Sequence, residues 1–243
     1  MIRLILVVLF LAVFLILSLP IQLVIWLLSF KWPKAPDHVS YPLVGWAFKV
    51  VMFLSGTKLT ILGEENRLHD EAVLYVGNHK SFFDVVCAYP IINRPGAFLA
   101  KKSLGKVPGL NIWMTLLHCV FLDRDDIKQG LQCILKCIDM IKDGISVVVF
   151  PEGTRSEDDG IQEFHEATMK IATKTGCTIV PMAINNTNAV LEDHFPIIKR
   201  THVIIEFLEP IHLDELSSED KKKIGAYTRA KIVEAYNKNK ELI

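Results

Sequence analysis

The sequence has no excess of either charge and few cysteines. Lysine plus arginine and aspartate plus glutamate number 27 each among its 243 residues. Without a basic surplus or a recognisable nucleic-acid motif, nothing indicates a nucleic-acid partner. The cysteine number is odd and no Cys-x-x-Cys pair occurs, which argues against a disulfide framework and a structural zinc site. The pattern suits a reducing, cytosolic location for the main domain. The five thiols are Cys87, Cys119, Cys133, Cys137 and Cys177.

Charge is missing altogether from a long run near the start of the chain. No charged residue occurs from Leu4 to Phe30, where only Pro20, two serines and one glutamine interrupt the apolar pattern. A continuous helix of this length extends about 40 Å, whereas a bilayer core is about 30 Å thick. We therefore expect either a tilted membrane span or a hairpin of two shorter helices that meet near Pro20. A signal peptide is disfavoured, because the run is long and no small-x-small cleavage site follows it.

The flanks of this run indicate its orientation. Arg3 precedes it, whereas Lys31 and Lys34 follow it. Trp26 and Trp32 near its end are typical of the interface between bilayer and water. The positive charges after the run weakly favour a membrane protein whose main domain lies on the cytoplasmic face.

A second apolar stretch runs from Tyr41 to Leu54, and it is too short to span a bilayer comfortably. Its composition is compatible with a helix in the membrane surface and equally with a helix of the protein core. We expect residues 1–56 to form a membrane-associated N-terminal segment, and residues 57–243 to form one globular domain.

After Gly63, short apolar runs alternate with helical patterns. The clearest helix is Ile127–Lys142, where apolar residues recur at steps of three and four. Another helix is expected over Glu163–Thr175, and the polar stretch Ser217–Lys240 is expected to be a surface helix. This alternation predicts an α/β fold with a mixed, largely parallel sheet flanked by helices, to which the N-terminal apolar helix or hairpin is attached. The expected strands are Ala72–Val76, Ala97–Ala100, Cys119–Leu122, Ser146–Phe150, Thr178–Ile184 and His202–Phe207.

Active sites in such folds gather in the loops beyond the carboxyl ends of the strands. The loop after Val76 holds His79 and, five positions later, Asp84. Across a first helical turn, this spacing lets the carboxylate accept a hydrogen bond from one ring nitrogen and leaves the other nitrogen free as a base. An imidazole with an ordinary pKa of about 6.5 takes a proton from a hydroxyl at neutral pH. The alternative is a loop histidine beside an aspartate that caps a helix.

The loop after Phe150 carries a second group of polar residues. Gly153 lets the backbone approach a ligand closely, and the guanidinium of Arg155 matches the oxygens of a phosphate. Glu152 is costly to bury without a partner, so we expect it to meet a cation or a ligand hydroxyl. Taken alone, this loop could also be read as an ordinary polar turn without a binding function.

Taken together, these loops resemble the sequence blocks of the glycerolipid acyltransferase family, which includes lysophosphatidic acid acyltransferases. That family carries four blocks in a fixed order, and the matching segments cover about half of the chain. The first block is a histidine and an aspartate separated by four residues, and the third matches residue for residue. The four segments are Asn78–Asp84, Ala100–Pro108 followed by Phe121–Arg124, Phe150–Ser156, and Ile179–Ile184.

Two positions depart from the family pattern. Asn111 stands near where the second block usually continues to a glycine. After the third block, many members show phenylalanine, lysine, any residue and glycine, whereas residues 164–167 here read Phe-His-Glu-Ala. The missing lysine affects one phosphate contact of the family and leaves the His79–Asp84 pair untouched.

The resemblance implies an acyltransferase domain over residues 57–243. Its reaction is direct transfer of a fatty acyl group from acyl-CoA or acyl-carrier protein to the sn-2 hydroxyl of 1-acylglycerol-3-phosphate, which gives phosphatidic acid. His79 is implied as the general base and Asp84 as the residue that orients it. No cofactor and no metal is implied. Substrate contacts are expected from Glu152, Gly153, Thr154, Arg155, Arg124 and Lys101.

Some alternatives stay open at this point. Lys101, with Lys102 and Lys106, either contacts the phosphates or the acidic carrier protein of the donor, or forms a solvated positive face. The acceptor is alternatively another lysophospholipid or an acyl amino acid lipid. Alternatives of another class are a membrane-anchored lipid-binding protein, which the intact histidine–aspartate pair disfavours, and a phosphoester hydrolase that uses His79 on phosphate.

Overall fold

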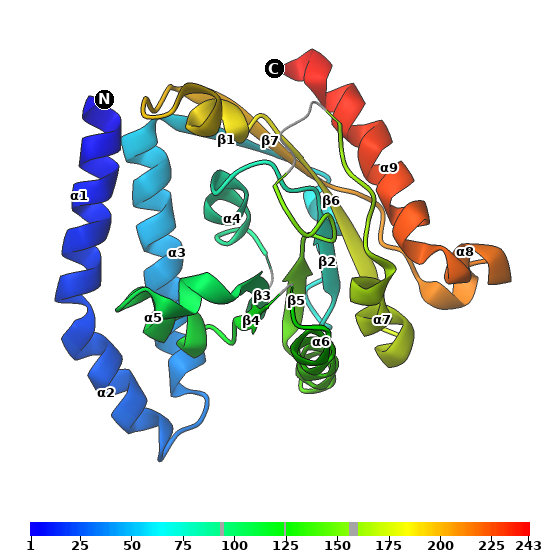
Figure 1. Ribbon diagram of the computed structural model, residues 1–243, viewed down its shortest axis with the longest axis horizontal. Coiled ribbons are helices and arrows are strands. Elements are labelled where there is room, and N and C mark those ends of the chain that lie inside the picture. Colours follow the sequence, from blue (N-terminus) through cyan, green and yellow to red (C-terminus); the bar gives the residue numbers. More distant parts are fainter. Residues whose placement is uncertain (93–94, 124, 156–159) are drawn as a thin grey trace.

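One sheet forms the centre of the molecule, with helices on both of its faces (Figure 1). The computed structural model describes residues 1–92, 95–123, 125–155 and 160–243, and seven strands lie within these ranges. The strands are β1 (Thr57–Leu62), β2 (Leu74–Gly77), β3 (Gly96–Lys101), β4 (Val120–Leu122), β5 (Ser146–Val149), β6 (Ile179–Asn185) and β7 (Thr201–Phe207). The α-helices are α1 (Ile2–Leu17), α2 (Leu19–Ser29), α3 (Ala35–Ser55), α4 (Phe83–Ala88), α5 (Leu110–Leu116), α6 (Ile127–Lys142), α7 (Glu166–Thr175), α8 (Ser218–Lys222) and α9 (Ile224–Asn239).

The sheet is mixed and largely parallel, which confirms the fold class expected from the sequence. Its strand order is β1-β7-β6-β2-β5-β3-β4. Neighbouring strands are parallel, except that β6 and β7 are antiparallel. The strand β1 is not among those expected from the sequence. Its side chains are only half-buried and include the exposed Lys58, so it lacks a strong apolar run.

Alternate side chains of the strands point into two separate hydrophobic layers. On one face of the sheet, Tyr75 packs in a cluster with residues of α1, α3, α4 and α5. On the other face, Leu74 packs in a cluster with residues of α6, α7 and α9. Because both faces are covered, β2, β5 and β6 are buried over their whole length, which explains their continuous apolar runs. The polar C-terminal stretch forms α8 and α9, and α9 contributes Ile232 and Tyr236 to the second layer.

The apolar N-terminal run forms two helices that meet at Ser18 with a bend of 45°. Pro20 lies in the first turn of α2, where a proline removes no intrahelical hydrogen bond. The break is held by contacts with the region of α5. Trp113 Nε1 donates to Ser18 Oγ at 2.9 Å, and Gln22 Nε2 donates to a backbone carbonyl just before α5 at 3.1 Å. No single described helix is long and apolar enough to cross a membrane, whereas this bent pair meets both criteria.

The helix α3 has one face in the core and one at the surface. Tyr41, Val44 and Val51 are buried in the same cluster as residues of α1, α4 and α5. On the other face Trp46 is exposed, and Phe53 is 82% exposed. For the stretch Tyr41–Leu54, the expectation of a core helix therefore holds for one face of α3. Most of the exposed large apolar side chains of the described residues lie on α1, α2 and α3, an unusual concentration for a surface in water.

We expect Ser18→Ala to lower the free energy of unfolding by about 1–3 kcal/mol, because the buried Trp113 N–H then lacks its acceptor. Ser29→Ala is the matched control, since Ser29 lies in the same apolar run but makes only a solvent-exposed bond to Trp26 O. Equilibrium unfolding in urea and a mild detergent measures both variants. Equal losses would show that α5 does not hold the break between α1 and α2.

Candidate active site

Asn78 fixes the end of β2 against the neighbouring strand β6. Its side chain donates to Ile184 O and accepts from Ile184 N, each at 2.8 Å. These two bonds continue the pairing of the strands through a side chain, at the point where the β2 backbone turns away. The turn of residues 79–82, which leads into α4, therefore starts from a fixed point at the carboxyl edge of the sheet.

His79 and Asp84 form a hydrogen-bonded pair at this turn. His79 Nδ1 lies 2.7 Å from Asp84 Oδ2. The Asp84 side chain is fully buried, whereas that of His79 is 18% exposed. The Phe150 ring stacks on the imidazole, with ring centroids 4.4 Å apart. Because Nδ1 is bonded to a carboxylate, the neutral ring carries its proton there, and the lone pair of Nε2 can accept a proton.

Asp84 accepts more hydrogen bonds than its pairing with the histidine requires. Its Oδ2 also accepts from the backbone N–H groups of Lys80 at 2.7 Å and Ser81 at 2.8 Å. Its Oδ1 accepts from the hydroxyl of Thr187, which lies in the segment after β6. Four donors leave the carboxylate one orientation, and the carboxylate in turn fixes the imidazole.

Two further carboxylates hold the same turn. Glu152 Oε1 accepts from His79 N at 2.7 Å, and Glu192 Oε1 accepts from Phe82 N at 2.9 Å. Together with the two bonds to Asp84, these contacts bind all four backbone N–H groups of residues 79–82 to acidic side chains. None of these four groups is free in this structure to stabilise an oxyanion.

Glu152 is buried between the two loops. Its second oxygen, Oε2, accepts from Gln162 N at 2.8 Å, and only 3% of the residue is exposed. Burial raises the pKa of the Glu152 carboxyl, and the bonds from His79 N and Gln162 N act in the opposite direction. Each oxygen already accepts one backbone donor, so the side chain ties the His79 turn to the segment after residue 160.

Arg155 extends over the same turn. Its guanidinium carbon lies 4.0 Å from the centroid of the Phe82 ring, and its Nη1 donates to Glu192 Oε1 at 3.2 Å. The side chain remains 40% exposed. Part of the guanidinium is therefore accessible to a ligand, beside Phe82, which follows His79 by three residues.

Gly153 adopts a backbone conformation that would be strained for other residues. Its φ of +75° lies in the left-handed region, where a side chain is strained. A Cβ at this position would lie 3.1 Å from Cδ2 and Nε2 of His165. The ring of His165, which stands where many family members have lysine, therefore lies directly beside this loop.

The other residues expected to contact the substrate, as far as the structure describes them, make no hydrogen bond or ion pair with the turn of residues 79–82. Lys101 ends β3, which runs parallel to β5, so it lies at the same edge of the sheet and is exposed. Lys102 is paired with Asp123 at 2.9 Å, which offsets one charge of the basic cluster. Thr154 is exposed in the loop after β5. Arg124 lies outside the described residues.

The neighbouring hydroxyl and thiol are poor candidates for a nucleophile. Ser81 Oγ donates to Glu192 Oε2 at 2.7 Å and accepts from Phe83 N at 2.9 Å. Cys87 is fully buried. Burial, with the nearby Asp84 carboxylate as a smaller cause, raises the pKa of the Cys87 thiol. The hydroxyl is therefore engaged, and the thiol stays protonated and inaccessible.

Thr187 and Glu192 contact the site, although no sequence motif singles them out. Both follow β6: Thr187 directly precedes the short 3₁₀ helix η3 (Asn188–Val190), and Glu192 begins the next one, η4 (Glu192–His194). Their position in the strand order is the feature that could have predicted them. β6 runs parallel to β2, so the loop after β6 leaves the same carboxyl edge as the loops after β2 and β5.

Comparison with known proteins gives the class. A protein-family model described as Acyltransferase matches residues 58–185, just over half of the chain. The chain therefore belongs to the acyltransferase family, and the resemblance seen in the sequence is confirmed.

Individual relatives agree with this assignment. The chain is 28% identical over 196 residues to a 1-acyl-sn-glycerol-3-phosphate acyltransferase of Borreliella burgdorferi, covering 81% of this chain and 78% of that one. It is 27% identical over 204 residues to the enzyme of the same name from Escherichia coli, with 82% and 80% covered. The crystal structure of the 1-acyl-sn-glycerophosphate acyltransferase PlsC from Thermotoga maritima is similar with a TM-score of 0.75 and 25% identity. That match covers 96% of this chain and 97% of the other, so the N-terminal helices belong to the shared architecture.

We expect Asp84→Asn to lower turnover by a factor on the order of 10²–10⁴, because an amide favours the wrong imidazole tautomer. An amide also cannot accept at both atoms from the four donors around Asp84, so we expect a lower melting temperature. Steady-state kinetics and thermal unfolding measure the two effects. Asp139→Asn, on an exposed face of α6, is the control. An unchanged turnover with a raised acceptor KM would make Asp84 a binding residue instead.

Proposed function

We propose that this protein transfers a fatty acyl group from an acyl thioester to the sn-2 hydroxyl of 1-acylglycerol-3-phosphate, giving phosphatidic acid. The observation that carries the proposal is the His79–Asp84 pair, with 2.7 Å between Nδ1 and Oδ2, at the carboxyl edge of the sheet. The activity named for the Borreliella burgdorferi and Escherichia coli relatives supports this choice of acceptor.

In the proposed reaction, His79 Nε2 removes the proton from the acceptor hydroxyl while that oxygen attacks the thioester carbonyl carbon. The tetrahedral intermediate then collapses, the carbon–sulfur bond breaks, and the imidazolium returns its proton to the thiolate. Asp84 holds the ring and stabilises the imidazolium. A thiolate is a good leaving group, so no enzyme nucleophile is required. The engaged Ser81 hydroxyl and the buried Cys87 thiol are consistent with direct transfer.

The phosphate of the acceptor is assigned to Arg155. Its planar guanidinium matches two phosphate oxygens at once, which an ammonium cannot do. Gly153 lets the backbone come close to the head group, and the exposed Thr154 adds a hydroxyl in the same loop. Glu152 acts on the acceptor site mainly through the turn that it holds, because both of its oxygens accept backbone donors. Arg124 is proposed to assist in binding the head group.

Acyl-CoA and acyl-carrier protein both present the thioester that this mechanism needs. Lys101 is exposed and has no ion pair with any residue that the structure describes, in contrast to Lys102. Its ammonium is therefore available to the phosphate groups of either donor.

We also propose that residues 1–56 hold the protein to a membrane, with residues 57–243 on the cytoplasmic face. The acceptor and the product are both lipids, so attachment brings the site to the place where they reside. Support comes from the outer faces of α1, α2 and α3, where side chains such as Leu9, Leu23 and Phe53 are exposed. Their burial among acyl chains removes this apolar area from water.

His79→Ala is expected to reduce acyl transfer by a factor on the order of 10²–10⁴ or more, because the general base is lost. The assay is thiol release from an acyl thioester, with and without lysophosphatidic acid. His69→Ala, at an exposed position outside the site, is the control. Near-full activity of a folded His79→Ala protein would falsify the mechanism. Phosphate release without thiol release would identify a phosphoester hydrolase.

Arg155→Ala is expected to lower catalytic efficiency with lysophosphatidic acid by roughly 10–100-fold, since each charge-assisted bond to phosphate contributes roughly 1.5–3 kcal/mol. Monoacylglycerol, which lacks the phosphate, is expected to be affected much less. Arg155→Lys retains the charge without the fork and is expected to fall between wild type and Arg155→Ala. Equal losses for both acceptors would assign Arg155 to support of the loop or to the donor.

Membrane attachment through burial of apolar side chains predicts resistance to salt. We expect full-length protein to stay with the membrane fraction after a high-salt wash, because salt screens charges but does not weaken apolar burial. Centrifugation followed by detection of the protein in pellet and supernatant measures this. Complete release by salt alone would mean that charge, and not the apolar run, holds the protein.

A further inference from the structure

The start of α1 and the end of α3 lie side by side at one end of the N-terminal helices (Figure 1). The sheet topology shows which end this is. β1 begins at Thr57, directly after α3, and runs parallel to β7, which is antiparallel to β6. β6 in turn is parallel to β2. The starts of β1 and β7 therefore lie at the edge where β2 and β6 end, which is the edge of the candidate active site.

Two arginines meet at Gly56, at this end of the helices. Gly56 has a φ of +77° and no side chain, and the stem of Arg200 crosses it. A Cβ at this position would lie 2.7 Å from Arg200 Cγ, so the crossing depends on glycine. The same point lies 3.5 Å from Arg200 Nε and 3.5 Å from Arg3 Nε. The two guanidinium groups are therefore neighbours in space, although Arg3 lies in the first turn of α1 and Arg200 directly precedes β7.

No acidic side chain of the described residues neutralises this pair. Neither the Arg3 nor the Arg200 side chain makes a hydrogen bond or an ion pair with any residue in the ranges that the structure describes. Two cations this close repel each other. The C-terminal end of α3 offers only about half of one negative charge. Two adjacent guanidinium groups without a carboxylate match the oxygens of a phosphate anion.

Exposed apolar side chains lie next to the pair. Ile2, next to Arg3, is 76% exposed, and Phe53, in the last turn of α3, is 82% exposed. A dissolved phosphate gains nothing from such side chains. A phospholipid offers its phosphate to the arginines and its acyl chains to the apolar residues around them. The combination therefore favours a lipid over a soluble anion.

We propose that Arg3 and Arg200 form a binding site for the phosphate of an anionic phospholipid in the bilayer. This contact holds the catalytic edge of the sheet at the level of the head groups, while the outer faces of α1, α2 and α3 lie among acyl chains. It is separate from the acceptor contact at Arg155. It rests on the proposed membrane attachment of residues 1–56, but it does not depend on the proposed reaction.

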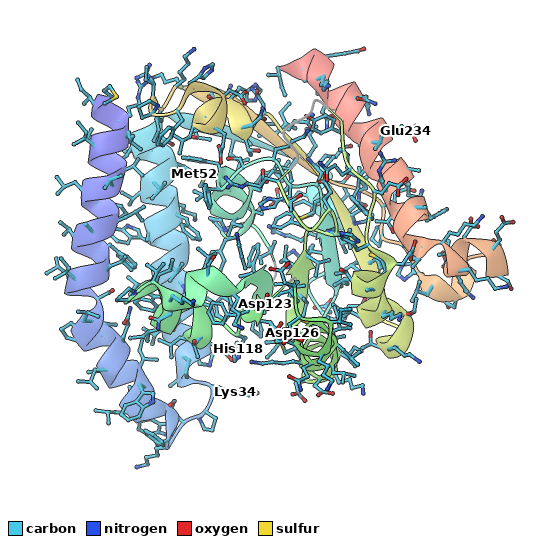
Figure 2. The ribbon with its side chains drawn as sticks, in the orientation of Figure 1. Lys34, Met52, His118, Asp123, Asp126 and Glu234 are labelled. Atoms are coloured by element: carbon cyan, nitrogen blue, oxygen red, sulfur yellow. The ribbon has the colours of Figure 1, made fainter. Side chains whose placement is uncertain are left out.

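The opposite end of the same helices offers a matched control. Lys31 and Lys34 are exposed in the connection between α2 and α3, and Lys31 Nζ lies 5.1 Å from the Trp32 ring centroid. Figure 2 shows Lys34 at the lower end of these helices, away from the start of α1. The two lysines carry the same charge as the two arginines and also lie beside apolar side chains.

The test is binding of the full-length protein to vesicles of phosphatidylcholine, with and without phosphatidylglycerol, measured by co-sedimentation. Replacing both arginines, Arg3→Gln with Arg200→Gln, is expected to weaken the preference for phosphatidylglycerol vesicles roughly 30-fold, or about 2 kcal/mol. Binding to pure phosphatidylcholine is expected to stay unchanged. Lys31→Gln with Lys34→Gln is expected to change the preference much less.

Three outcomes would overturn the site. Equal losses from the arginine and lysine pairs would indicate diffuse attraction to the charged surface. An unchanged preference in the arginine variant would show that the pair binds no lipid. The third outcome concerns the melting temperature of the detergent-solubilised protein. If glycerol phosphate raises it as much as short-chain phosphatidylglycerol does, the site binds soluble phosphate.

Two controls keep this site separate from folding and from catalysis. The melting temperature of the double arginine variant in detergent shows whether it folds. If it does not fold, the single variant Arg200→Gln takes its place, and its preference for phosphatidylglycerol vesicles is expected to fall roughly fivefold. Activity on detergent-dispersed lysophosphatidic acid is expected to stay at the wild-type level in the arginine variant. An inactive wild type would contradict the proposed reaction and leave the vesicle result intact.

Discussion

The turn between β2 and α4 depends on a single constraint, which is that four consecutive backbone N–H groups need acceptors that the sheet does not supply. Three carboxylates supply them: Asp84 from α4, Glu152 from the loop after β5, and Glu192 from the segment after β6. A buried N–H without an acceptor costs about 1–3 kcal/mol. The same acids therefore stabilise the turn and set the position of the imidazole that begins it.

These bonds also connect the site to distant parts of the chain. Glu152 accepts from Gln162 N, and Arg229 of α9 donates to the carbonyl groups of Ile161 and Gln162. His79 is thus joined to the C-terminal helix through one glutamate and one short segment. On the other side, the segment after β6 supplies Thr187 and Glu192 to the same turn. The position of the imidazole is therefore a property of the assembled domain and not of its loop alone.

The sequence predicts well what local interactions determine. α6 begins and ends at the predicted residues, Ile127 and Lys142, because a strong apolar period and the Asp126 cap define it locally. The histidine–aspartate pair is local too, since the short turn of residues 79–82 before α4 brings the two side chains together. Features made by distant contacts escape prediction. β1 is a strand only because β7 pairs with it, and Glu192 reaches the turn only because β6 brings it there. The break between α1 and α2 near Pro20, by contrast, is among the alternatives expected from the sequence.

The pairing of β1 with β7 has a consequence for the order in which this protein is made. Thr60 Oγ1 of β1 is bonded to His202 Nε2 of β7, 142 residues away along the chain. On the ribosome, α1, α2, α3 and β1 emerge long before β7 exists. During that interval β1 keeps an open edge, and the inner faces of the apolar helices lack the sheet that later covers them. The apolar faces of these helices are therefore exposed to other molecules well before the domain that covers them is complete.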